Sequence, residues 1–150
     1  MKTNMIKKIV ATGIIVLLTS TDVFGDSLQI PLFSDHRADA NLNEINPGLI
    51  YEYDLTDIDT EIGVINISAV GGGYKNSYKK LTAIVGGEVQ YKFVGVQAGI
   101  ATGYKQRTGQ NLSPMLSLFA EAPVTDSFSV RGSYIPSKHG VFVFSIVVDY

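Results

Sequence analysis

The sequence contains two histidines, and one of them, His36, is expected to lie near partners with which it can do chemistry. His36 follows a short apolar segment at residues 28–34, and Asn76 and Ser77 follow another at residues 63–74. An imidazole exchanges protons near neutral pH, while a hydroxyl and an amide donate and accept hydrogen bonds. If both segments are strands that end on the same side of one sheet, the three side chains can meet at its rim. His36, Asn76 and Ser77 are therefore the candidate site residues.

Other motifs of site chemistry are missing from the sequence. Cysteine is absent, so neither a disulfide framework nor a thiolate metal site is available. The glycines at positions 71–73 precede no Lys-Ser or Lys-Thr pair and open no helix, which favours a strand end over a phosphate-binding loop. No metal cluster or nucleic-acid motif is evident, and we expect neither a cofactor nor a nucleic-acid partner.

The end of the sequence, residues 141–150, alternates with a period of two, which indicates a strand with two different faces. The first face is apolar and aromatic and is expected to face lipid, while the second can face a barrel interior. A terminal strand that ends on an aromatic residue resembles the closing strand and assembly signal of bacterial outer-membrane β-barrels. The lipid face comprises Phe142, Phe144, Ile146, Val148 and Tyr150, and the interior face comprises Val141, Val143, Ser145, Val147 and Asp149.

The amino terminus indicates export. Lysines at positions 2, 7 and 8 precede an apolar run at residues 9–18, and Val23-Phe24-Gly25 provides a cleavage site before Asp26. A membrane anchor would need a run of about 20 apolar residues. We therefore predict a signal peptide at residues 1–25 and one domain, an outer-membrane β-barrel, at residues 26–150.

Eight segments after the signal have the alternating or apolar pattern of short strands, with turn residues between them. Longer polar connections alternate with tight ones, as in barrels whose long loops lie outside and whose short turns lie in the periplasm. The predicted fold is all-β, an eight-stranded antiparallel transmembrane β-barrel with both ends on the periplasmic side. The predicted strands are residues 28–34, 48–54, 63–74, 81–91, 94–104, 114–122, 128–135 and 141–150.

Charge is distributed unevenly between the two expected ends of the barrel. Basic residues concentrate in the expected outer loops, and acidic residues concentrate in the expected periplasmic turns. A basic outer rim would attract lipopolysaccharide phosphates, although solvated loop charges explain the pattern equally well. The basic set is Arg37, Lys75, Lys79, Lys80, Lys105, Arg107 and Lys138, and the acidic set is Asp54, Asp57, Asp59, Glu61, Asp126 and Asp149.

Residues 94–101 predict which face of one strand is interior. One face carries Val, Val, Ala and Ile, and the other carries Gly95, Gln97, Gly99 and Ala101. Small inward residues leave room in an eight-stranded barrel, whose interior otherwise just holds packed side chains or one slim ligand. Alternatively, the glycines relieve crowding or strong twist.

The order of several short motifs resembles that of the lipid A palmitoyltransferase (PagP) family, from about residue 28 to the end of the chain. These motifs are Ile30-Pro31 followed by His36, then Asn43-Glu44, Lys75-Asn76-Ser77 and Tyr134-Ile135-Pro136. The resemblance implies transfer of a palmitoyl chain from a glycerophospholipid to lipid A, with the barrel interior measuring the chain.

The resemblance also implies roles for the candidate residues. The family uses a His in the first outer loop and an Asp-Ser pair in the second, which correspond here to His36, Asn76 and Ser77. His36 would act as a general base or orienting group and Ser77 as its hydroxyl partner. Asn76 replaces the family's Asp; it can orient a neighbour by hydrogen bonding but cannot act as a carboxylate base. Asn76→Asp is then expected to raise activity.

Three functions remain open on the sequence. The first is an active acyltransferase, and the second is a non-catalytic barrel that binds lipid or alters the cell surface, either cellular or phage-encoded. The third is a deacylase-like hydrolase, although its His-any-Ser arrangement is missing around both His36 and His139. The expected partners are lipopolysaccharide, phospholipid and the barrel-assembly machinery. The expected state is a monomer in a bacterial outer membrane.

Overall fold

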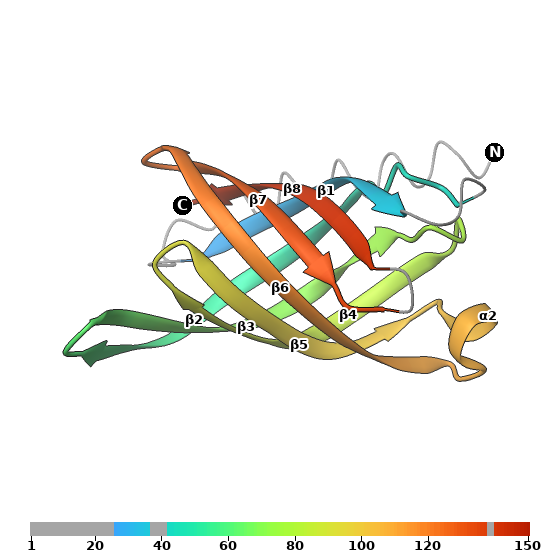
Figure 1. The fold of residues 1–150 in the computed structure, drawn as a ribbon, viewed down its shortest axis with the longest axis horizontal. Helices are drawn as coiled ribbons and strands as arrows, with labels where there is room; N and C mark the ends of the chain where they lie inside the picture. The colour runs from blue at the N-terminus through green and yellow to red at the C-terminus, as the bar shows by residue number, and fades with distance from the viewer. Residues whose placement is uncertain (1–25, 37–41, 138–139) are drawn as a thin grey trace.

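The computed structural model describes residues 26–36, 42–137 and 140–150, and the predicted signal peptide at residues 1–25 lies outside them. Eight strands close into one antiparallel barrel, in which each strand pairs with the next and β8 pairs with β1 (Figure 1). This confirms the predicted fold class. The strands are β1 Ser27–His36, β2 Gly48–Thr60, β3 Gly63–Lys75, β4 Leu81–Tyr91, β5 Val94–Thr102, β6 Leu112–Thr125, β7 Phe128–Ile135 and β8 Val141–Asp149.

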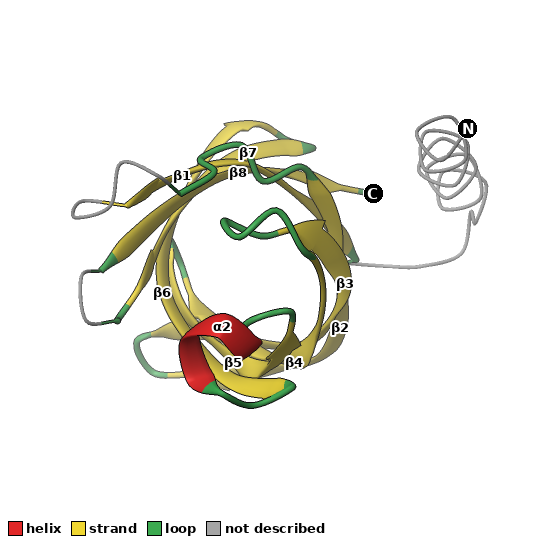
Figure 2. Ribbon diagram, turned by 90° about the vertical axis from the view of Figure 1, so that its right-hand side faces the viewer, coloured by secondary structure: helices red, strands yellow, loops and turns green. Residues whose placement is uncertain are grey.

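The two ends of the barrel differ (Figure 1), and Figure 2 looks onto the end that carries the short helix. The loop end carries the longer connections, including the short helix α2, Lys105–Thr108, between β5 and β6. The turn end carries the tight connections between β2 and β3, β4 and β5, and β6 and β7. Asp26 and Tyr150 also meet at the turn end, where the Tyr150 amide donates to the Asp26 carbonyl at 3.2 Å.

Side chains alternate between the barrel interior and its outer surface, as a strand period of two requires. On β8, Ser145 and Val147 are buried in the interior, while Phe144 is exposed outside and stacks on Phe33. On β5, Gln97 and Ala101 are buried, as the sequence predicts. Apolar side chains cover the outer surface and polar ones line much of the interior, the reverse of a water-soluble barrel.

No helix within the described ranges has the length and apolar character needed to span a bilayer. This finding applies to helices only.

The β2–β3 hairpin is longer than the sequence analysis predicts. β2 extends to Thr60 instead of ending near residue 54, and the hairpin projects beyond the barrel at the turn end (Figure 1). Residues 54–60 form a strand by pairing antiparallel with residues 63–68 of β3, with a bulge between Asp54 and Thr56. Asp54 and Asp57 accept hydrogen bonds from β3, at 2.8 Å from Ser68 and 2.7 Å from Asn66. These acidic residues therefore lie on a strand and not in a turn.

Glycine at the β4–β5 interface permits a close approach of two strands. Gly86 and Gly99 are partners in the register. A Cβ atom on either residue would collide with backbone atoms of the facing strand. These glycines therefore serve close strand packing, which for Gly99 is the second of the two explanations that the sequence leaves open.

A lysine on the lipid-facing side of β8 is expected to destabilise the barrel in a bilayer. Phe144→Lys should cost about 2–4 kcal/mol if the side chain lies near mid-membrane, and the loss of stacking on Phe33 adds to this cost. The measurement is the free energy of unfolding in urea after refolding into lipid vesicles. Ile62→Lys is the control, because Ile62 lies in the β2–β3 turn and is 71% exposed. Equal effects of the two lysines would contradict a lipid-facing β8.

Candidate functional site

A β-bulge in β1 turns the candidate histidine into the barrel. In a regular strand Gln29 and Pro31 would share their face with Phe33 and not with His36. The register between β1 and β8 shifts between Pro31 and Phe33, which makes Leu32 an extra residue. Phe33 consequently packs outside against Phe144, while His36, two residues after the buried Ser34, borders the interior. Bulges commonly re-aim side chains in this way beside active sites.

His36 and Ser77 meet at the loop end, as expected from the sequence. His36 is the last residue of β1, and Ser77 follows β3 in the connection to β4. The His36 Nε2 atom lies 2.6 Å from the Ser77 Oγ atom, which is hydrogen-bonding distance. The arrangement is an imidazole-hydroxyl pair, of a kind that can carry a proton to or from a reacting group.

Ser34 is a second hydrogen-bonding partner of the same imidazole, and Asn46 is in turn bonded to Ser34. The sequence does not predict these two residues at the site. The Asn46 Nδ2 atom donates to the Lys75 carbonyl at 3.0 Å, so its Oδ1 atom is the one that accepts from Ser34, at 2.5 Å. With its hydrogen given to Asn46, Ser34 can only accept from His36 Nε2, at 3.0 Å. In this arrangement Nε2 carries a hydrogen, and the Ser77 hydroxyl hydrogen is left to be donated elsewhere.

The side chain of Asn76 is not part of this pair. Asn76 is fully buried, and its Oδ1 atom accepts from the amides of Tyr78 and Lys80 at 2.9 and 3.0 Å. Its Nδ2 atom donates to Thr82 Oγ1 at 2.9 Å and to the Gly103 carbonyl at 2.8 Å. These bonds hold the β3–β4 connection in shape, so Asn76 supports the position of Ser77 through the backbone.

These contacts reverse the effect expected for Asn76→Asp. A carboxylate keeps the bonds from the two amides but places a negative oxygen against the Gly103 carbonyl, which can only accept. We expect a loss of about 1–3 kcal/mol in the free energy of unfolding and no gain in activity. Thr82→Val is the control, because it removes one partner of Asn76 without adding charge. A variant Asn76→Asp that is both stable and more active would contradict this account.

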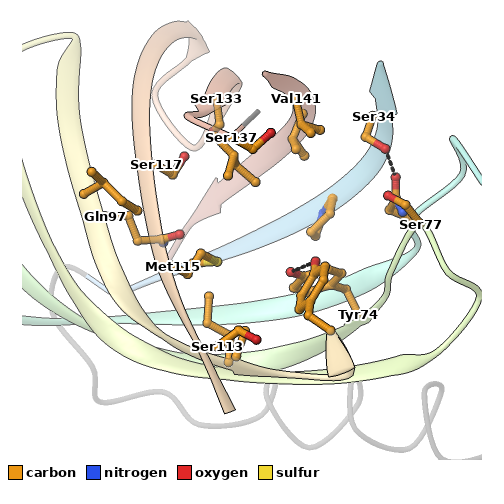
Figure 3. A pocket seen from close by; sticks show the side chains of 18 of the residues that line it. Ser34, Tyr74, Ser77, Gln97, Ser113, Met115, Ser117, Ser133, Ser137 and Val141 are labelled. Atoms are coloured by element: carbon orange, nitrogen blue, oxygen red, sulfur yellow. Dashed lines mark hydrogen bonds between the residues drawn. The ribbon is translucent and has the colours of Figure 1, made fainter. Parts of the chain in front are cut away.

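The His36-Ser77 pair borders a cavity of about 420 Å³ inside the loop half of the barrel. Apolar residues Ile50, Ile84 and Met115 line it together with several serines and two glutamines. Figure 3 shows Ser34 and Ser77 at one end of the cavity and Gln97 and Ser117 further along it. Cavities of this size hold small or slender ligands.

Two tyrosines form part of the cavity wall near α2. The hydroxyls of Tyr74 and Tyr104 lie 2.7 Å apart, and the Tyr104 ring packs edge-on against Tyr78. Tyr104 lies beyond the end of β5, and burial raises the pKa of its phenol. The phenol therefore stays protonated and can donate a hydrogen bond at neutral pH.

Backbone pairing between β6 and β7 stops beside the cavity. β6 and β7 pair only from Leu118 and Tyr134 down to the turn end, while β6 begins at Leu112. Residues 112–117 pair with β5 but with no residue of β7 in the described part of the chain. Pro114 lies in this stretch and Pro136 follows β7, and both line the cavity. Since proline donates no backbone hydrogen bond, these positions do not favour closure of the ladder.

A buried ionic cluster lies on the turn-end side of the cavity. The Arg131 guanidinium on β7 contacts three carboxylates, at 2.7 Å from Glu52, 2.9 Å from Glu88 and 2.7 Å from Glu121. Gln97, which lines the cavity, donates to Glu88 at 3.2 Å and so joins the two regions. The cluster crosses the barrel interior between β2, β4, β6 and β7.

This cluster is not among the predicted features, although the sequence carries a signal for it. Glu52, Glu88, Glu121 and Arg131 each lie inside a predicted strand, at a position that alternates with outward apolar residues. Opposite charges at inward positions of a small barrel predict contact across its interior. No comparable signal exists for Ser34 and Asn46, because their contact depends on the bulge in β1 and on the fold of the following loop.

Comparisons with known proteins support the fold alone. No protein-family model matches the chain, and no curated protein does. A solved structure described as "De novo design of transmembrane beta-barrels" is similar to this chain, with a TM-score of 0.54 and 12% sequence identity. The match covers 87% of this chain and 98% of the designed one. The fold is therefore that of a transmembrane β-barrel.

Proposed function

We propose that this chain is an outer-membrane acyltransferase that moves a palmitoyl chain from a phospholipid to lipid A. The observation that carries the proposal is the 2.6 Å contact between His36 and Ser77 beside the cavity. The apolar outer surface and the fold support a membrane location. The substrate class rests on the family resemblance in the sequence.

The chemistry assigned to His36 is proton transfer. A hydroxyl of lipid A attacks the ester carbonyl of the phospholipid, and the bond to the glycerol oxygen breaks. His36 Nε2 gives its hydrogen to the departing glycerol oxygen and regains one from the attacking hydroxyl, so the two proton transfers balance. Ser77 donates a hydrogen bond to the ester oxygen as negative charge develops there, which its position beside His36 permits.

The stretch where β6 and β7 do not pair is the route that we assign to an acyl chain entering from the bilayer. Pro114 and Leu116 lie in this stretch, and both line the cavity together with Pro136, so a chain that enters here avoids the polar loops. The apolar side chains of Ile50, Ile84 and Met115 then provide a surface for its methylene groups.

Basic residues at the loop end support an anionic acceptor. Lys75, Lys79, Lys80, Lys105 and Arg107 lie at the same end as His36. They would attract the phosphates of lipid A and hold its hydroxyls near the cavity mouth.

The test uses the purified barrel with a phospholipid labelled in its palmitoyl chain and with lipid A. The proposal expects the label to move to lipid A and lysophospholipid to form in equal amount. Label recovered as free palmitate would indicate a hydrolase, and unchanged phospholipid would contradict catalysis.

A non-catalytic lipid-binding barrel is the second candidate. The hydrogen bond from Ser34 to Asn46 favours it, because this bond makes His36 Nε2 a donor and not a base. A barrel of this kind would retain phospholipid through purification and would leave it intact.

A further inference from the structure

The cavity contains one polar atom whose hydrogen bonding is incomplete. Gln29 on β1 is 5% exposed and lines the cavity, and its Nε2 atom donates to Ser145 at 2.9 Å. Its Oε1 atom is buried without a partner in the described part of the chain. Such an atom normally has a hydrogen-bond partner in the protein, in water or in a ligand. A polar group is therefore expected within hydrogen-bonding distance of Gln29 Oε1.

Gln29 lies at the end of the cavity that is further from His36 and nearer the turn end of the barrel, which we call the deep end. It precedes His36 by seven positions on β1, which is roughly 20 Å along a strand. In the register it faces Ile50 on β2, and the next inward pair, Ser27 and Glu52, belongs to the ionic cluster. An acyl chain whose ester lies at His36 would therefore bring its far end, and not its ester, to Gln29.

The chemistry of the amide restricts what fits there. If its oxygen and nitrogen are exchanged, Ser145 donates to the oxygen and the nitrogen becomes the atom without a partner. A hydroxyl both donates and accepts, so it satisfies Gln29 in either orientation. The methyl group at the end of a plain acyl chain forms a hydrogen bond with neither orientation of the amide. Gln97 and two serines, Ser117 and Ser133, also line the cavity and add to its polar character.

We propose that the deep end of the cavity binds a hydroxyl group at the far end of a bound acyl chain. The proposal rests on the proposed function in taking the cavity as an acyl site, and it adds tighter binding of a chain with a hydroxyl at its far end. A water molecule could supply the same hydrogen bonds to Gln29, bound between the Gln29 amide and the methyl end of a plain chain.

The test compares the binding of palmitate and ω-hydroxypalmitate to the full barrel in detergent by isothermal titration calorimetry. We expect the ω-hydroxy acid to bind at least about fivefold more tightly, because an unmet buried hydrogen bond costs at least that factor. In Gln29→Met the preference should disappear. Ser113→Ala, at the cavity end near α2, should keep it.

Other outcomes separate the two proposals. Equal binding of both acids, or tighter binding of palmitate, would overturn the hydroxyl site in favour of water and leave the acyl site standing. A preference that persists in both Gln29→Met and Gln29→Leu would also overturn it. Binding of neither acid would overturn the hydroxyl site together with the acyl cavity of the proposed function.

Discussion

Ser77→Ala and His36→Ala are each expected to lower palmitoyl transfer roughly a hundredfold to ten-thousandfold, the contribution of a positioned proton-transfer group. Both side chains are only partly buried at the loop end, so their removal should leave the barrel folded. The measurement is the initial rate of label transfer from phospholipid to lipid A. The double variant should be little slower than either single variant, because the two residues act as one unit.

The control for these variants is Ser127→Ala. Ser127 lies in the turn between β6 and β7, at the opposite end of the barrel from His36. Its rate should equal that of the unchanged protein. Near-normal transfer by Ser77→Ala or His36→Ala would contradict the assigned roles.

Arg131→Met is expected to destabilise the barrel by about 3–5 kcal/mol, because removing one partner leaves buried charges without compensation. Glu52 and Glu88 are almost completely buried, and Arg131 bridges them with two nitrogens each. The Phe119 ring, centred 4.1 Å from the guanidinium carbon, also loses its cation. The measurement is the free energy of unfolding in urea in detergent micelles.

Removing the carboxylates as well should reverse most of this loss. In the quadruple variant Glu52→Gln, Glu88→Gln, Glu121→Gln and Arg131→Met, the cluster no longer holds unpaired charges, and neutral replacement of a buried ionic cluster is often tolerated. If Arg131→Met alone is as stable as the original, the cluster does not stabilise the fold.

The overall barrel can be predicted from the sequence because its evidence is local. The strand from Val141 alternates so regularly that its inward and outward faces follow directly, and Ser145 and Phe144 lie on the predicted sides. The strand from Val94 is equally regular, with Gln97 inside. A period of two needs no knowledge of distant residues, so a pattern of this kind survives folding.

The details of the site depend on contacts that no local pattern carries. The extra residue Leu32 changes which side chains of β1 face inward, and only the pairing with β8 reveals it. The side chain of Asn76 is directed by Thr82 and Gly103, which lie in later parts of the chain. Family position alone therefore assigns Asn76 a role that its contacts do not support.

The ionic cluster on the turn-end side of the interior can be predicted only in part from the sequence. Glu52, Glu88 and Arg131 come from three separate strands, and their contact follows from barrel closure. Inward charges are visible in the sequence, but which of them meet depends on the stagger between strands.

The measurement that tests acyl transfer most directly is mass spectrometry of lipid A from bacteria with and without this protein. The account predicts a lipid A species that is heavier by one palmitoyl group in cells that make the unchanged chain. It also predicts that this species is absent when the chain carries Ser77→Ala, with the barrel still present in the outer membrane. Identical lipid A in all three strains would contradict the account and would favour a lipid-binding barrel without catalysis.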